Sequence, residues 1–354
     1  MNYKYSKKFY LYVVGILILT GFLGKIFLTL STKHLVTSHY LDEYLLSKYS
    51  PDMRYDQFYL LKKNNLDFNS YLFCTSACLV MNPDLLETGQ RGFNLSIGAG
   101  QISDFLKYFN WILSNRNIPK KIFIGVEFYS FSDVKFVKSI PHEIESNIFL
   151  KIRNLYMDFS FEKYLLYKFI FNENTEIDKK KIKKLEYAKN GRRFYEDFFK
   201  RKNDNKAYQV HINKLANSIV KDDFDDSIAL EQINKFNDLL EIAKKNDIEI
   251  SIFFIPLHKK FLKLNNGSMY FDEIKLIEEI FKKTKINEIF YFNNFNKINN
   301  NYSFFERDLN HINYNAAKLV EYDLKNKKAA TGMIISRKNL NNDITLLKKI
   351  YEKN

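Results

Sequence analysis

Short apolar stretches alternate along the chain with segments whose apolar residues keep helical spacing. The short stretches, which we expect to form strands, are 70–74, 91–96, 121–128, 248–255 and 288–292. The helical spacing predicts helices over 101–115, from residue 226 or 227 to about 243, over 272–283 and over 313–324. Strands that alternate with helices are typical of α/β proteins, so we expect a doubly wound, mostly parallel sheet over residues 67–325.

Three segments lie outside this alternation. Residues 132–226 are rich in aromatic side chains and Lys, and they predict a mostly helical insertion that covers the sheet. Residues 32–66 are expected to form a helical stalk before the domain, and residues 326–354 a basic, peripheral tail.

The N-terminal segment 9–30 is apolar apart from Lys25 and is long enough to cross a bilayer. Lys25 lies near one end, where its side chain can reach the interface. Because Lys4, Lys7 and Lys8 precede the segment, we expect the N-terminus in the cytoplasm and the main domain outside it, periplasmic or extracellular. A cleaved signal peptide is the alternative, although no small-x-small cleavage site follows. A buried soluble helix fits less well, because the segment is apolar on all faces.

The composition indicates an ordered protein, with 46% hydrophobic and 27% charged residues among 354. The net charge of +14 comes largely from Lys, which is dense in 179–184. On an exported chain this charge fits contact with anionic lipid or an anionic wall polymer, and a solvated helix face is the plainer interpretation. No nucleic-acid partner is expected outside the cytoplasm.

Two short segments far apart in the sequence carry residues suited to acyl transfer. Ser76 follows the first predicted strand, and Asp308 and His311 precede the last predicted helix. A serine that attacks, a histidine that takes its proton and an aspartate that orients the histidine form a minimal set for this chemistry. Each signal alone is weak, because a serine after a strand is more often a helix N-cap. Their order within an α/β frame is what favours a site, since residues after parallel strands gather at one edge of the sheet.

Other candidate residues receive structural interpretations. Cys74 and Cys78, the only cysteines, flank Ser76 and are interpreted as packing residues, with a bond between them left open. His258 follows Pro256 and is interpreted as structural rather than as part of the site. The sequence shows no convincing metal-ligand spacing and no glycine-rich phosphate loop, so we expect neither a metal nor a cofactor.

The chain resembles the SGNH (GDSL-type) hydrolase superfamily, in particular its membrane-anchored, extracytoplasmic branch. That branch includes accessory proteins of teichoic-acid D-alanylation and of alginate or peptidoglycan O-acetylation, which work beside membrane-bound O-acyltransferases. The resemblance covers most of residues 67–325 and implies a three-layer sandwich. The matching blocks are 73–76, 93–98, 123–131, 255–258 and Asp308-x-x-His311.

The resemblance implies that Ser76 is the nucleophile, His311 the base and Asp308 the partner of the base. A serine at a strand-to-helix turn can offer its own backbone N–H to an oxyanion. A second N–H is expected from the turn that runs from Ser96 to Gly98.

The sequence also departs from the superfamily pattern. Cys74 replaces the usual glycine two residues before the nucleophile, and Thr75 replaces the Asp of GDSL. The usual oxyanion-binding Asn after the third strand is missing, and Glu127 and Tyr129 are found there instead. The membrane-anchored branch often lacks that Asn too, so its absence counts more against hydrolysis than against membership.

These observations lead to two main functional hypotheses. The first is a serine acyltransferase or esterase that acts on acyl groups, O-acetyl foremost, of a cell-envelope polysaccharide. The alternative is a non-catalytic anchored partner with the same fold that binds glycan or a membrane-bound O-acyltransferase. A soluble lipase is disfavoured by the predicted anchor.

Overall fold

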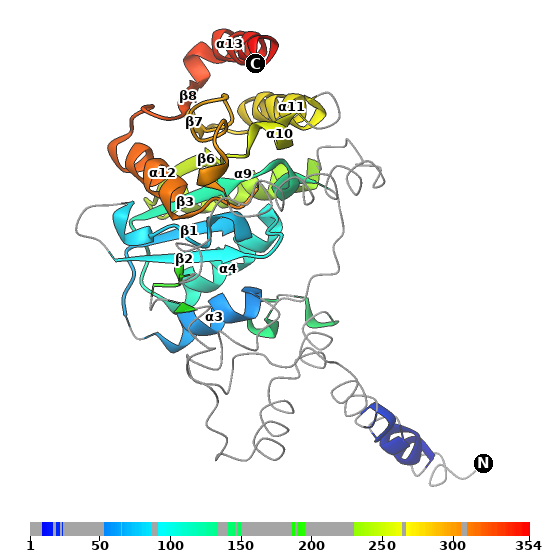
Figure 1. Cartoon of the computed structure of the whole chain (residues 1–354). Helices are drawn as coiled ribbons and strands as arrows, with labels where there is room; N and C mark the ends of the chain where they lie inside the picture. Colours follow the sequence, from blue (N-terminus) through cyan, green and yellow to red (C-terminus); the bar gives the residue numbers. More distant parts are fainter. Residues whose placement is uncertain are drawn as a thin grey trace. The chain divides into compact units, whose positions relative to one another are not determined.

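The computed structural model describes residues 9–16, 19–21, 23, 53–64, 66–86, 91–132, 141–145, 147–149, 186–187, 190–194, 230–263, 267–305 and 310–354. The chain divides into two compact units, 1–59 with 139–182 and 60–138 with 183–354. The second unit holds the sheet and the candidate site (Figure 1). Asp308, most of the predicted insertion and the lysine-rich segment 179–184 lie outside the described residues.

The main sheet has six strands in the order β2-β1-β3-β6-β7-β8. The first five are parallel, and β8 is antiparallel to β7. Their bounds are β1 Ser70–Thr75, β2 Gly92–Ile97, β3 Lys121–Val126, β6 Glu249–Phe254, β7 Glu288–Tyr291 and β8 Met333–Ser336. The predicted α/β fold with a mostly parallel sheet is therefore confirmed, and each of the five predicted strands is present.

Helices cover both faces of this sheet. Phe73 of β1 contacts Phe105 and Phe109 of α4, whereas its neighbours Leu72 and Cys74 belong to a core shared with α12. Successive residues of a strand point to opposite faces, so α4 and α12 lie on opposite sides. The helix bounds are α4 Ile102–Asn115, α9 Leu230–Lys245, α10 Lys259–Leu262, α11 Ser268–Lys283 and α12 Tyr314–Asn326.

Burial on both faces explains the continuous apolar runs of the central strands. Every residue of β1, β2 and β3 is buried. Parallel strands covered by helices on both sides have no solvated face and therefore no polar alternation.

The C-terminal segment differs from the predicted peripheral tail. Residues 326–354 contain β8, which pairs with β7, and helix α13 Leu340–Lys353. Ile344 and Leu347 of α13 are buried, and Tyr351 stacks on Tyr270 of α11. The basic composition hid helix α13, because its lysines occupy exposed positions, and β8 is only four residues long.

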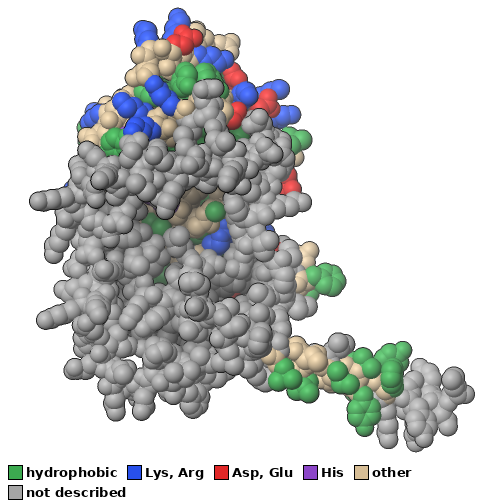
Figure 2. Space-filling view, turned by 45° about the vertical axis from the view of Figure 1, so that its right-hand side comes forward, with side chains coloured by type: hydrophobic (Ala, Val, Ile, Leu, Met, Phe, Trp, Pro, Cys, Tyr) green, Lys and Arg blue, Asp and Glu red, His purple; other side chains and the backbone are tan. Residues whose placement is uncertain are grey.

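The N-terminal apolar segment is described only in part. Residues 9–16 and 19–21 are helical, and Phe9 and Leu11 are 65% and 72% exposed. Figure 2 shows several hydrophobic side chains along this segment. Among the described residues, no helix is both long enough and apolar enough to span a membrane, so the anchor over 9–30 stays a prediction. The predicted stalk is described from residue 53 onward, where α3 spans Met53–Lys63.

Only a small part of the predicted insertion over 132–226 is described. It includes a short antiparallel hairpin, β4 Glu186–Tyr187 and β5 Arg193–Phe194. The Asn94 N–H of β2 donates to the carbonyl of Asn190 in this hairpin at 2.8 Å. The hairpin therefore borders the outer edge of β2.

Candidate active site

The site lies where the strand order of the sheet reverses. From β1 the chain continues to β2 on one side, and later to β3 on the other. In open α/β sheets, ligands bind outside the carboxyl ends of the strands at such a switch point. Ser76 directly follows β1 and Glu127 directly follows β3.

Ser76 and His311 meet at this edge although they are 235 positions apart. Ser76 Oγ lies 2.8 Å from His311 Nε2, and both residues are half-buried. This confirms the predicted approach of the two side chains. When Ser76 donates to Nε2, the proton of the ring is on Nδ1, as a general base requires.

The other ring nitrogen of His311 contacts its sequence neighbour. Asn310 Oδ1 lies 3.1 Å from His311 Nδ1, a geometry in which the ring N–H donates to the amide carbonyl. Sequence reasoning missed Asn310, although an amide oxygen fills this orienting role in Cys-His-Asn proteases. Asp308, the predicted partner, lies outside the described residues, so its role stays a prediction.

The two candidate partners of His311 can be separated by substitution. We expect Asn310→Ala to lower acyl-transfer rates roughly two- to tenfold, the effect of about one neutral hydrogen bond. Asp308→Asn should cost more, because a carboxylate also stabilises the imidazolium that forms, while leaving partial activity. Initial rates on an activated ester measure both, and the reverse order would identify Asn310 as the main orienting group.

A backbone bridge and a hydrogen bond fix the two ends of the segment that carries His311. Phe305 and Ile312 form an isolated antiparallel bridge, and the Asn313 N–H donates to the Phe304 carbonyl at 3.0 Å. Asn313 then caps α12 by accepting from the Asn315 and Ala316 N–H groups. His311 is therefore placed by the start of a helix.

Thr75, rather than Ser76, caps the turn that follows β1. Thr75 Oγ1 donates to Glu127 Oε1 at 2.8 Å and accepts from the Ala77 N–H at 3.4 Å. This caps the short 3-10 turn Ser76–Cys78 and leaves the Ser76 hydroxyl to His311. The interpretation of Ser76 as a mere N-cap therefore does not describe this turn.

Asn94 of β2 also supports this turn through hydrogen bonds to carbonyl groups at its end and after it. Its Nδ2 donates to the carbonyls of Cys78 and Met81, both at 2.9 Å. Its Oδ1 accepts from the N–H and the hydroxyl of Ser96, at 2.9 and 2.5 Å. The N–H and the hydroxyl of the fully buried Ser96 are thus bound to Asn94, so this N–H is not open to an oxyanion. Gly98 is half-exposed beyond β2, and its role as an oxyanion donor stays a prediction. Sequence reasoning missed Asn94.

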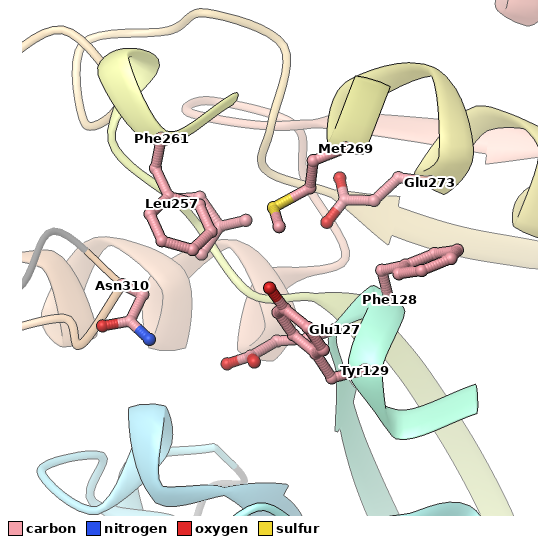
Figure 3. Close-up of a pocket in the computed structure, with 8 residues that line it drawn as sticks. All are labelled: Glu127, Phe128, Tyr129, Leu257, Phe261, Met269, Glu273 and Asn310. Atoms are coloured by element: carbon pink, nitrogen blue, oxygen red, sulfur yellow. The ribbon is translucent and has the colours of Figure 1, made fainter. Parts of the chain in front are cut away.

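A small pocket adjoins these residues (Figure 3). Glu127 and Tyr129, both predicted site residues, line it together with Asn310. The other lining residues are Phe128, Leu257, Phe261, Met269 and Glu273. The space measures about 210 Å³ including open solvent, which is small for a ligand site. Through Asn310 and Glu127 the pocket borders both His311 and the turn that follows β1.

Cys74 and Cys78 form a disulfide, with their Cα atoms 5.9 Å apart. Both residues are fully buried in the core, as the interpretation as packing residues expected, and the bond that the sequence left open is present. The signal was the Cys-x-x-x-Cys spacing across a strand-to-helix turn, which brings the two side chains within bonding reach.

Glu273 is a buried carboxyl beside the pocket whose pKa is strongly shifted. Burial raises its pKa to about 8, hydrogen bonds from Asn293 and Tyr291 oppose this, and the charge of Glu127 adds to the rise. Tyr291 Oη donates to Glu273 Oε2 at 3.0 Å, and Asn293 Nδ2 donates to the same atom at 2.9 Å. At neutral pH the folded protein therefore holds Glu273 largely protonated.

This pKa predicts a pH-dependent stability. Because the pKa is raised on folding, the native state binds the extra proton, and the free energy of unfolding falls as pH rises from about 4.5 to about 8. Glu273→Gln resembles the protonated side chain. The free energy of unfolding, measured at pH 5.5 and at pH 8.5, should therefore change less with pH in the variant than in wild type, and the two changes should differ by about a few kcal/mol. Glu231→Gln, at an exposed site on α9, is the control and should keep the wild-type difference. An unchanged pH difference in Glu273→Gln would contradict the protonated state.

His258 has the structural position that the sequence suggested. It is fully buried, its Nδ1 accepts from the Lys260 N–H at 3.2 Å, and its ring stacks on Tyr302 with centroids 4.1 Å apart. Burial, with Lys260 and Lys259 nearby, lowers its pKa to about 4, so the ring is neutral at pH 7. The His258 ring also contacts the ring of Phe305, the residue that bridges to Ile312, so His258 packs against residues that fix the position of His311.

The site thus combines a serine hydroxyl, an imidazole whose two ring nitrogens each contact a side-chain oxygen, and a capped turn at the switch point of a mostly parallel sheet. Comparisons with protein-family models, with curated proteins and with solved structures found no match to this chain.

Proposed function

We propose that this chain is a serine acyltransferase or esterase of the SGNH (GDSL-type) kind, anchored in the cytoplasmic membrane with its domain outside. Its substrate is an acyl group, foremost O-acetyl, on a cell-envelope polysaccharide. The observation that carries the proposal is the 2.8 Å contact between Ser76 Oγ and His311 Nε2. Such a hydrogen bond between hydroxyl and base is the signature of an activated nucleophile.

The chemistry follows from this contact. Ser76 Oγ attacks the acyl carbonyl carbon while its proton passes to His311 Nε2. The tetrahedral intermediate collapses to an acyl-serine, and His311 returns the proton to the departing oxygen. A sugar hydroxyl or water then attacks the acyl-serine, with His311 again taking and returning the proton.

The likeness to SGNH proteins has support in the order of the elements. The nucleophile follows the first strand, the histidine precedes the helix after the last parallel strand, and the sheet order places both at one edge. By the same likeness we propose a membrane-bound O-acyltransferase as partner. Glu127 accepts a hydrogen bond from Thr75 at the place where the superfamily has an oxyanion-binding Asn.

The proposed location gives a direct prediction. A reporter that is active only outside the cytoplasm, fused after Asn354, should be active, because Lys4, Lys7 and Lys8 precede the apolar segment. The same fusion without residues 1–31 serves as the control and should be inactive. Activity of a cytoplasmic reporter on the full chain would contradict the proposed substrate.

The proposed reaction is tested with a fluorophosphonate probe on the full chain. We expect a covalent adduct that peptide mass spectrometry places on Ser76, because the probe reports an activated serine. Ser268, exposed at the start of α11, should remain unlabelled and is an internal control. The absence of an adduct on Ser76 would favour the non-catalytic partner that binds glycan or acyltransferase.

A further inference from the structure

The disulfide Cys74–Cys78 closes a small ring of residues around Ser76, which we call the 74–78 ring. Both cysteines are fully buried, whereas Ser76 is half-buried and reaches His311. The sulfur atoms therefore lie on the side of the turn that faces the core, and the Ser76 hydroxyl lies on the side that faces His311. A bond made in the core thus spans the backbone that presents the nucleophile.

The hydrogen bonds within this turn are long. The Leu79 N–H donates to the Ser76 carbonyl at 3.3 Å, and the Ala77 N–H to Thr75 Oγ1 at 3.4 Å. Both distances exceed the usual range for N–H···O bonds. The shorter bonds from Asn94 hold carbonyls from Cys78 onward, beyond the serine. The covalent bond therefore spans the part of the turn where the hydrogen bonds are long, between Thr75, which Glu127 holds, and the carbonyls that Asn94 holds.

The core leaves little room for two separate thiols. A Cβ placed on Gly125 of β3 would lie 2.7 Å from Cys74 Sγ and 2.6 Å from the Phe253 ring. Two thiols cannot approach as closely as bonded sulfur atoms. Because the interior is densely packed, the reduced side chains must separate by moving the turn that joins them.

We propose that the Cys74–Cys78 disulfide is a positioning element for Ser76, and that oxidation of these two thiols brings the nucleophile into register with His311. The proposal rests on the proposed role of Ser76. In the step, the two thiols lose two electrons and two protons and form the S–S bond, while a disulfide of a thiol–disulfide oxidoreductase or of glutathione is reduced to two thiols. At the proposed location outside the cytoplasm such an exchange can proceed, so by this proposal the chain acquires reactivity only after export.

The test compares thiol and disulfide forms of the full chain in lipid nanodiscs. The chain is synthesised with dithiothreitol or with oxidised glutathione, and its thiols are counted with a maleimide under denaturing conditions. We expect the thiol form to react with fluorophosphonate at Ser76 roughly ten- to a hundredfold more slowly, the effect of a displacement of about 1 Å. Subsequent oxidation by glutathione disulfide should restore the rate.

Variants separate positioning from folding. Cys74→Ala/Cys78→Ala should react slowly under both conditions, with far-UV circular dichroism like that of wild type. If this variant fails to fold, the reduced and reoxidised wild-type forms still decide the question. Equal labelling rates in thiol and disulfide forms would overturn the positioning role alone, as would a thiol form without native circular dichroism. No Ser76 adduct in any form would instead overturn the proposed function, and the positioning role with it.

Discussion

Ser76→Ala is expected to abolish acyl transfer while leaving the protein folded. Without the hydroxyl no acyl-serine can form, so activity should fall by roughly 10⁴- to 10⁶-fold, to the level that binding alone supports. Thr75 provides the cap of the turn, so Ser76→Ala removes only the contact with His311 and should cost about 1 kcal/mol of stability or less. The measurement is polymer acylation in cells that lack the native copy.

The matched control is Ser268→Ala, which removes one hydroxyl from an exposed position at the start of α11. It should leave acylation unchanged. The comparison is valid when immunoblots show equal levels of the two variant proteins. Normal acylation by an abundant Ser76→Ala protein would mean that the chain works by binding, and the non-catalytic hypothesis would then hold.

His311→Ala should reduce acyl transfer by a similar factor, because the serine hydroxyl is a weak nucleophile without a base. Since the two residues act as a unit, Ser76→Ala/His311→Ala should be no less active than either single variant. The measurement is the rate of the purified variants on an activated ester, with His258→Phe as the control. That control keeps the aromatic stacking on Tyr302 and should retain most activity.

The His311 series also distinguishes a working site from coincidental proximity. If Ser76 Oγ and His311 Nε2 are functionally coupled, the effects of the two substitutions will not add. Additive losses, or a His311→Ala variant with near wild-type rates, would show that the 2.8 Å contact does not serve catalysis.

The sequence alone determined the fold class and the pairing of Ser76 with His311. Strands covered on both faces have few polar positions, so β1 and β3 are visible as short apolar runs at 71–74 and 122–126. Helices such as α4 bury one stripe, which the spacing of Phe105 and Phe109 records. Because parallel strands end at one edge, their order along the chain placed the two site segments together.

Only the tertiary structure decided which groups support the candidate site. Thr75 is the cap because Glu127, at the end of another strand, accepts its hydroxyl, and Asn94 supports the turn from β2. Residues 333–336 form a strand because their backbone pairs with the edge of β7. Local periodicity records burial, whereas hydrogen-bond partners and disulfides depend on which distant residues the fold brings within a few ångströms. The sequence therefore predicted where the candidate site lies, and the packing decided which groups hold Ser76 and His311 in place.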